Sequence, residues 1–161
     1  MRSRKRKPSR AELNEWINRL CGEESYGPEV WMKLSPEDFE PFLQAADVRL
    51  LESPVISAAA APSWIRRAVD ELIAEAGRTV THFLLHIGSF GHILSLDTLS
   101  EIVAGAQGVI DMRAANFIVG YRAMEGLKDG EVTLLALASM GLKPQADETV
   151  LDTEAIFGFP R

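Results

Sequence analysis

Cysteine is almost absent from this sequence, because Cys21 is the single cysteine among 161 residues. One thiol cannot form an intramolecular disulfide, which excludes a scaffold held together by disulfides. Aromatic residues are also scarce at 7%, whereas hydrophobic residues make up 47% and charged residues 25% of the chain. These proportions are typical of globular proteins and exclude a disordered or collagen-like chain. At this length we expect one domain with a sizeable core.

Long apolar segments are missing as well. The longest stretch without Asp, Glu, Lys or Arg runs from Thr79 to Leu96, and it contains all three histidines and two glycines. A membrane-spanning helix needs about 20 mostly apolar residues, so we expect no transmembrane segment. The basic start of the chain leads into an amphipathic stretch, which is not typical of a secretory signal. We therefore predict a cytoplasmic protein, or a nuclear one if the source is eukaryotic, because RKRK resembles an import signal.

The first ten residues, MRSRKRKPSR, contain no acidic side chain. The other 151 residues hold 11 basic and 23 acidic residues, a formal balance of −12. Binding of duplex nucleic acid needs clustered Lys and Arg, so the acidic body is a poor candidate for that role. The basic segment is the candidate contact for nucleic acid, an acidic protein or an anionic membrane surface. Its candidate residues are Arg2, Arg4, Lys5, Arg6, Lys7 and Arg10.

Helix start signals recur along most of the chain. Ser9 and Glu12 form a capping box ahead of an apolar face at helical spacing. Ser35 followed by Pro36 marks a second start, and Ser63 precedes the most regular amphipathic pattern, which ends at Gly77. Apolar periodicity predicts helices over 9–22, 35–50, 63–77, 97–106 and 110–124.

Two segments fit either a helix or a strand. Residues 79–96 are apolar but rich in β-branched side chains and interrupted by glycine, and residues 131–140 are apolar nearly all round. Because helical signals dominate elsewhere, we predict a mainly α fold, a compact bundle of about five to seven helices with a flexible basic N-terminal arm. The alternative is an α+β fold with a hairpin around residues 79–96. The expected divisions are the arm at 1–8, one helical domain at 9–143 and a C-terminal tail at 144–161.

The three histidines lie close together in HFLLHIGSFGH, as His82, His86 and His92. On a helix, His82 and His86 share a face at the spacing that lets two imidazoles bind one zinc ion, and on a strand they also point to one face. In zinc proteases of the HExxH type a glutamate general base follows the first histidine, whereas Phe83 stands there in this chain. A phenyl ring accepts no proton, so that hydrolytic route is excluded. A zinc site of these three residues is one interpretation, and hydrogen-bonded core histidines without a cofactor are the other.

No other enzyme signature is present, since GxGxxG, GxxxxGK[ST], GxSxG and CxxC motifs are all missing. The leading hypothesis is a small non-enzymatic interaction or regulatory protein, whose acidic helical body binds another protein while the basic arm makes anionic contacts. Self-association into a homo-oligomer is compatible with this role. The alternatives are a metal-binding protein or metalloenzyme using His82, His86 and His92, and a nucleic-acid-associated protein acting through the arm.

Overall fold

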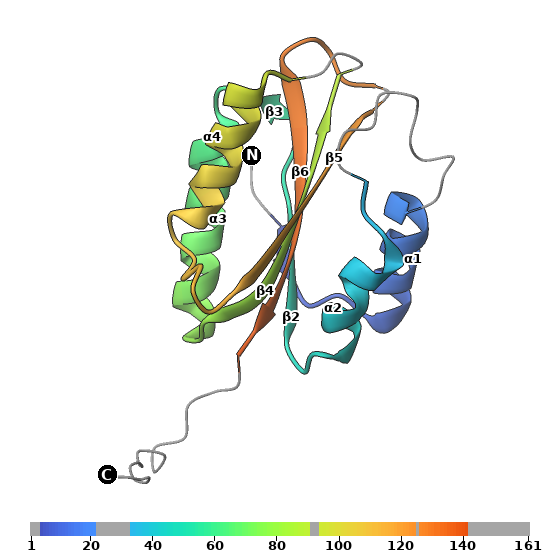
Figure 1. Ribbon diagram of the computed structural model, residues 1–161, viewed down its shortest axis with the longest axis vertical. Helices are drawn as coiled ribbons and strands as arrows, with labels where there is room; N and C mark the ends of the chain where they lie inside the picture. The colour runs from blue at the N-terminus through green and yellow to red at the C-terminus, as the bar shows by residue number, and fades with distance from the viewer. Residues whose placement is uncertain (1–3, 22–32, 91–93, 125, 142–161) are drawn as a thin grey trace, which may run out of the picture.

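The protein is built as three layers, a mixed β-sheet with helices on both faces (Figure 1). The computed structural model describes residues 4–21, 33–90, 94–124 and 126–141, and for residues 4–6 only the backbone is described. None of the helices in this part of the chain is long and apolar enough to cross a membrane.

In the described part of the chain the sheet has six strands, with the order β1-β2-β6-β4-β5 and with β3 paired to β6. Strands β4 and β5 run parallel, and every other pair is antiparallel. The long strands β4 and β6 lie at the centre, and β1 and β5 form the two edges. The strands are β1 (Arg4–Arg6), β2 (Val48–Glu52), β3 (Ile56–Ser57), β4 (Val80–Ser89), β5 (Asn116–Ala123) and β6 (Glu131–Met140).

Each face of the sheet carries its own helical layer. Helices α3 (Ala61–Ala76) and α4 (Leu96–Gln107) pack against one face. Helix α1 (Arg10–Cys21), the 3-10 turn η2 (Pro36–Phe39) and the short helix α2 (Glu40–Gln44) cover the other. In Figure 1 these two layers lie on opposite sides of the strands.

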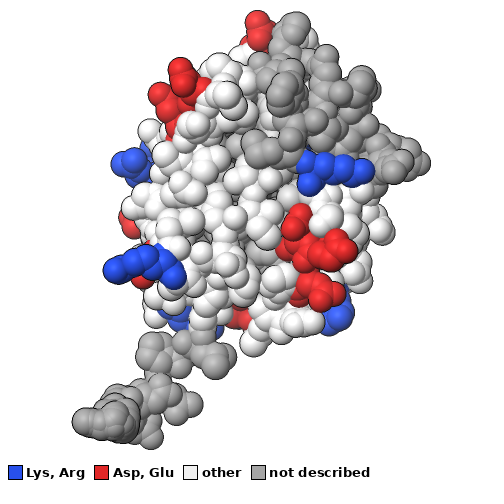
Figure 2. Space-filling view, viewed as in Figure 1, with Lys and Arg blue, Asp and Glu red and all other residues white. Residues whose placement is uncertain are grey.

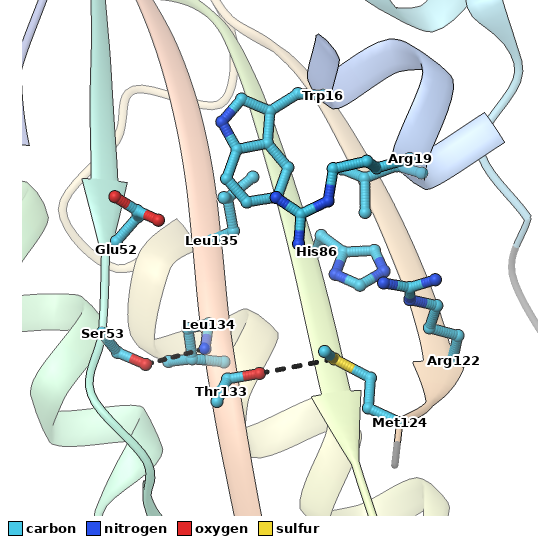
Figure 3. Close-up of a pocket in the computed structure, with 11 residues that line it drawn as sticks. Trp16, Arg19, Glu52, Ser53, His86, Arg122, Met124, Thr133, Leu134 and Leu135 are labelled. Carbon is cyan, nitrogen blue, oxygen red and sulfur yellow. Dashed lines mark hydrogen bonds between the residues drawn. The ribbon is translucent and has the colours of Figure 1, made fainter. Parts of the chain in front are cut away.

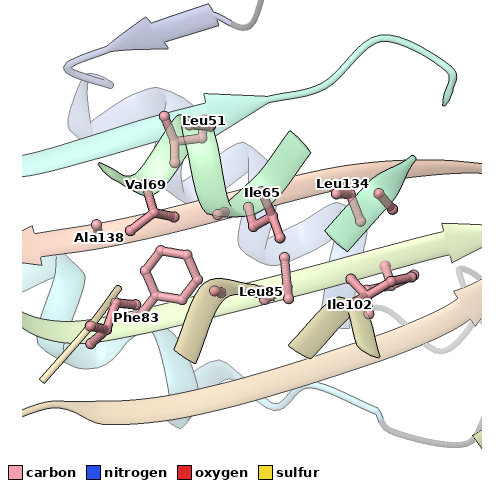
Figure 4. Close-up of a cluster of buried hydrophobic side chains, with 14 of the residues drawn as sticks. Leu51, Ile65, Val69, Phe83, Leu85, Ile102, Leu134 and Ala138 are labelled. Carbon is pink, nitrogen blue, oxygen red and sulfur yellow. The ribbon is translucent and has the colours of Figure 1, made fainter. Parts of the chain in front are cut away.

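The alternation of side chains along the strands divides the core into two clusters. On the α3/α4 face, Phe83 and Leu85 of β4 meet Ile65 and Val69 of α3 and Ile102 of α4 (Figure 4). On the α1/α2 face, the buried members come from α1, α2, the loop before η2 and the sheet. They include Leu13, Leu20, Leu34, Phe42, Leu50, Leu84 and Leu137. Because successive strand residues point to opposite faces, neighbours such as Leu84 and Leu85 belong to different clusters.

Local capping chemistry explains where several helices begin and end. The hydroxyl of Ser9 accepts a hydrogen bond from the Glu12 amide at 3.1 Å, at the start of α1. The carboxylate of Asp38 accepts the Ser35 amide at 2.8 Å at the start of η2. Helix α3 ends at Gly77, whose φ of +64° lies in the left-handed region that glycine adopts without strain. The sequence predicted these three boundaries within about two residues.

The prediction of a mainly α bundle, and with it the description of the body as helical, is wrong. The helix expected over 110–124 is replaced by strand β5, and the helix expected over 35–50 ends at Gln44, after which Val48 begins β2. The predicted hairpin around 79–96 is also wrong, because residues 80–89 form one strand paired on both sides. Residues 131–140, which the sequence left open, form strand β6. A strand buried on both faces is apolar throughout, so its pattern also contains helical spacings.

The basic N-terminal segment is not wholly a flexible arm, which corrects the second part of the fold prediction. Residues 4–6 form edge strand β1, in which Arg4 pairs with Glu52 and Arg6 with Leu50 of β2. The backbone of this segment is therefore part of the sheet. The proposed divisions at 1–8, 9–143 and 144–161 stay predictions, and residues 142–161 lie outside the described part of the chain.

Candidate functional site

A cavity of about 180 Å³ lies between α1 and the sheet (Figure 3). Its walls come from the second half of α1 and from the ends of four strands. Strands β2, β4 and β5 run in the same direction, because β2 and β4 are both antiparallel to β6 and β5 is parallel to β4. The cavity is therefore at the carboxyl ends of these three strands, where α/β sheets commonly bind ligands.

The register of the sheet sets the floor of the cavity. Leu135 of β6 pairs with Glu52 of β2 on one side and with His86 of β4 on the other, and His86 pairs with Gly120 of β5. Residues directly opposite one another point to the same face, so Glu52, Leu135 and His86 form a row beneath α1. Adjacent strands are about 4.8 Å apart, which places the Glu52 and His86 backbones about 10 Å from each other.

His86 is the buried polar group at the centre of this floor. The residue is 3% exposed, and its Nε2 atom has no hydrogen-bond partner among the described residues. Burial, and secondarily the positive charge of Arg122, lowers the pKa of His86 to about 3. The imidazole is therefore neutral at physiological pH. A buried polar atom without a partner lowers the stability of the folded protein by about 1–3 kcal/mol. The Nε2 atom of His86 can therefore still form a hydrogen bond with a ligand.

Two arginines border the His86 imidazole. Arg122 projects from β5, and Arg19 projects from α1, so that their guanidinium groups lie to either side of the ring in Figure 3. Arg19 also stacks over the indole of Trp16, with its Cζ atom 4.6 Å from the ring centroid. This cation–π contact holds an otherwise exposed cation at the cavity wall. The helical spacing of Trp16 and Arg19 places both on the same side of α1.

Glycine and methionine shape the inner end of the cavity. A Cβ atom added at Gly88 would overlap the sulfur of Met124, so the missing side chain makes room for the methionine. The Thr133 hydroxyl donates to that sulfur at 3.6 Å. On the opposite wall, the Ser53 hydroxyl accepts the Leu134 amide at 2.8 Å. The cavity therefore combines a polar centre with apolar walls, and its flexible methionine can adapt to an occupant.

The arrangement is suited to binding a small anion. Typical pockets for drug-sized ligands enclose about 300–1,000 Å³, and this cavity is smaller. Guanidinium groups match the geometry of a carboxylate, and the unpartnered nitrogen of His86 is a donor in one of its two neutral tautomers. General acid–base catalysis is less suited, because such a group works best with a pKa near the operating pH.

The structure does not bring His82 and His86, two of the three predicted metal ligands, together. His82 and His86 lie on the same face of β4, but four residues of a strand separate their backbones by about 13 Å. His82 instead has its Nδ1 atom 3.2 Å from the hydroxyl of Ser139. In the described part of the chain no three His, Cys, Asp or Glu side chains are grouped to hold a metal. His92 lies outside the described residues, so a site including it stays a prediction.

Ser139 and His82 are residue types that can act as a nucleophile and its general base, and their side chains are in contact. Ser139 is only 1% exposed, however, and its hydroxyl also lies 2.7 Å from that of Thr81. A nucleophile must reach the reacting atom of a substrate, and Ser139 has almost no exposed surface although it borders a hollow of about 400 Å³ beside α2. The cluster is therefore best explained as a hydrogen-bonded part of the core.

Of the basic residues expected to contact anions, the structure describes the side chains of Lys7 and Arg10. Lys7 has its Nζ atom 4.0 Å from a carboxylate oxygen of Asp47, and Arg10 donates to the Leu43 carbonyl at 3.4 Å. Both therefore make contacts within the fold. Arg2 and the side chains of Arg4, Lys5 and Arg6 lie outside the described part. Their role toward nucleic acid or another anionic partner stays a prediction.

Sequence reasoning missed Arg19, Arg122 and Glu52 as site residues. No motif links them, because the three come from α1, β5 and β2 and meet only when the sheet is assembled. One signal was available: His86 stands in an apolar stretch with no charged residue within seven positions on either side. A histidine among the apolar residues of a buried strand is a candidate for function, although satisfied core histidines share this pattern.

Comparison with known proteins gives little guidance. No protein-family model matches the sequence, and no curated protein matches it. Among solved structures, an FtsZ dimer from M. jannaschii is 16% identical over 71% of this chain and 33% of its own, with a TM-score of 0.47. Thiamine monophosphate kinase from Aquifex aeolicus is 12% identical over 79% of this chain and 41% of its own, with a TM-score of 0.32. The chain spans less than half of either protein, and neither likeness carries an argument.

Proposed function

We propose that this protein is a non-enzymatic regulatory module that binds a small organic anion in the cavity beneath α1. The observation that supports this best is the unpartnered Nε2 atom of His86, which is buried at the floor of that cavity. A ligand oxygen at this place would accept a hydrogen bond from the imidazole and remove the cost of the unused donor. The compartment proposed is the cytoplasm.

A carboxylate is the anionic group that the lining fits best. Arg19 and Arg122 offer donors on two sides of the imidazole, and Trp16 and Leu135 offer apolar contact for a short carbon chain. Glu52 faces the same row of the sheet from β2, and its negative charge disfavours a second charge on the ligand. The proposed ligand is therefore a small monocarboxylate rather than a phosphate dianion.

The same features argue for binding and against turnover. With a pKa of about 3, the imidazole of His86 has almost no basicity at neutral pH and has no second proton to donate. Burial beneath α1 further limits exchange with solvent. A ligand that contacts both Arg19 on α1 and His86 on the sheet would hold this helix against the sheet, which links occupancy to the stability of the α1 layer.

The test is isothermal titration calorimetry of the full chain with acetate, propionate and inorganic phosphate. We expect the two carboxylates to bind more tightly than phosphate. Because a charge-assisted hydrogen bond contributes about 1.5–3 kcal/mol, Arg19→Gln is expected to weaken carboxylate binding by roughly 10- to 100-fold. The matched control is Arg66→Gln, an exposed arginine on α3 at the far face of the sheet.

Two outcomes would contradict the proposal. One is the absence of carboxylate binding at millimolar concentration by the unmodified protein. The other is binding that Arg19→Gln and Arg66→Gln weaken equally, because that would place the anion on the general basic surface. Tighter binding of phosphate than of either carboxylate would reject the monocarboxylate assignment.

A further inference from the structure

The charged groups that line the cavity beneath α1 are divided between its two ends. The guanidinium groups of Arg19 and Arg122 lie beside the His86 imidazole. The Glu52 carboxylate lies on the other side of Leu135 (Figure 3). Strand pairing fixes this division, because Leu135 of β6 stands between Glu52 of β2 and His86 of β4. The cavity therefore has a cationic end and an anionic end.

The floor between these two ends is apolar. Leu135 pairs with Glu52 on one side and with His86 on the other, so all three side chains point to the same face of the sheet. Leu135 belongs to the buried cluster of the α1/α2 face, against which Trp16 of α1 packs. The backbones of Glu52 and His86 are about 10 Å apart. A ligand that reaches from one end of the cavity to the other therefore needs methylene groups in its middle.

The charge of the molecule disfavours a ligand that is purely anionic. The chain has a formal net charge of −6. Figure 2 shows acidic side chains gathered on the side of the molecule where α1 and α2 lie in Figure 1. A ligand with one negative and one positive charge has no net charge, so it approaches this surface without long-range repulsion.

Glu52 has the chemistry to bind a cationic group. The residue is half-buried, and a partly buried ion pair is screened by salt less than an exposed one. Glu52 already has another interaction within the fold, but the two oxygens of a carboxylate have about four acceptor sites, so a second donor can be accepted. An ammonium group is compact and carries three donors, which suits a site inside a small cavity.

We propose that the ligand of this cavity is a short ω-amino carboxylic acid, with a carboxylate at one end of its methylene chain and an ammonium at the other. The carboxylate binds at the guanidinium groups and accepts a hydrogen bond from His86, and the ammonium donates to Glu52. Glu52 is then the residue that determines specificity. An α-amino acid carries both charges on one carbon and cannot reach both ends. This inference rests on the proposed carboxylate site and adds the class of ligand.

The test is isothermal titration calorimetry of the full chain with γ-aminobutyrate, butyrate, α-aminobutyrate and butylamine. γ-Aminobutyrate differs from butyrate by the ammonium group alone, and α-aminobutyrate is its isomer with the two charges on one carbon. We expect γ-aminobutyrate to bind roughly fivefold to tenfold more tightly than butyrate, as one additional charged contact at a half-buried site allows. α-Aminobutyrate and butylamine should both bind more weakly than γ-aminobutyrate, because each lacks a charge at one end of the cavity.

Glu52→Gln tests which residue gives this preference. The change keeps the shape of the side chain and removes its charge. We expect the ratio of the two affinities, γ-aminobutyrate over butyrate, to fall to about one, with butyrate itself binding slightly more tightly because a like charge is removed. The matched control is Glu101→Gln, an exposed acid on α4 at the other face of the sheet. This variant should retain the preference of the unmodified protein.

Three results would overturn the proposal. Two concern the unmodified protein and do not depend on how a variant folds: γ-aminobutyrate that binds no more tightly than butyrate, or α-aminobutyrate that binds as tightly as γ-aminobutyrate. The third is a preference for γ-aminobutyrate that Glu52→Gln retains. Butyrate tests the carboxylate site by itself. If butyrate binds, each of these failures therefore leaves the proposed function standing, whereas a chain that binds neither butyrate nor γ-aminobutyrate contradicts both proposals.

Discussion

The carboxylate of Asp47 lies 2.6 Å from Nη1 of Arg78, and this contact joins the residue before β2 to the turn after α3. A second ion pair reaches Asp47 from Arg49, whose Nε atom is 2.8 Å away. The Asp47 side chain is only 6% exposed. Two guanidinium groups thus neutralise one buried carboxylate at the amino end of β2 and connect it to the opposite helical layer.

Asp47→Asn is expected to lower the free energy of unfolding by about 2–3 kcal/mol at pH 7, because both arginines lose a charged acceptor. The hydrogen bond and charge of Arg49, with the charges of Lys7 and Arg78, hold the pKa of Asp47 below its ordinary value. The stabilisation by the ionised Asp47 carboxylate is therefore complete above a pH of about 4. It is lost as the pH falls through the pKa that Asp47 has in the folded protein, which is lower than its ordinary value. Urea denaturation across this range measures it. Asp111→Asn, in an exposed ion pair, should change little.

Tyr121→Phe is expected to destabilise the protein by about 1–2 kcal/mol. The fully buried hydroxyl accepts the Leu94 amide at 2.6 Å and lies 2.8 Å from the Ser89 hydroxyl. Its removal leaves the Leu94 amide without this acceptor. Urea denaturation of Tyr121→Phe, Ser89→Ala and the double variant gives a double-mutant cycle. Additive effects of the two changes would contradict a direct interaction of the hydroxyls.

His86→Leu separates binding from stability. At pH 7 it should leave the free energy of unfolding unchanged or higher, because it removes an unpartnered polar group from the core. The unfolded chain takes up a proton near pH 6.5, whereas folded His86 does so only near pH 3. Between these values the original protein loses stability as the pH falls, by about 2 kcal/mol at pH 5. The leucine variant should lack this loss.

Chemical denaturation at pH 7 and pH 5 measures the difference, and an NMR titration of the imidazole follows the pKa directly. A folded-state pKa near 6.5 would contradict the burial of His86. The control is His82→Leu. This variant also removes an imidazole from β4, but that of His82 is half-buried and bonded to Ser139, unlike the buried and unpartnered imidazole of His86.

Gly105→Ala is expected to destabilise the contact between α3 and α4. A Cβ at Gly105 would overlap the carbonyl oxygen of Pro62 in the first turn of α3, and a backbone atom cannot move aside as a side-chain end does. Such overpacking typically costs about 1–3 kcal/mol. At Gly108 the nearest atom would be 3.3 Å away, at the Ala104 carbonyl. Thermal unfolding should therefore show a larger loss for Gly105→Ala than for Gly108→Ala.

Local sequence signals located the helices but did not identify the sheet. Ser9, Ser35 and Gly77 act within one turn of the chain, so their effects are readable from neighbouring residues. Strands β4 and β6 are buried on both sides, and their mostly apolar sequences lack the regular polar–apolar alternation that identifies a strand. In β5, the apolar residues Phe117 and Tyr121 happened to fit a helical spacing as well.

The amino-acid sequence by itself determined that the chain has a sizeable core, no intramolecular disulfide, an acidic body with a basic start, and helices at α1, α3 and α4. These properties depend on composition or on contacts between residues close in the chain. Only the tertiary structure decided that β4 separates His82 from His86 and that Arg19, Arg122, Glu52 and His86 line one cavity. The reason is physical: strand pairing joins residues far apart in the chain, and its register is set by the packing of both sheet faces at once.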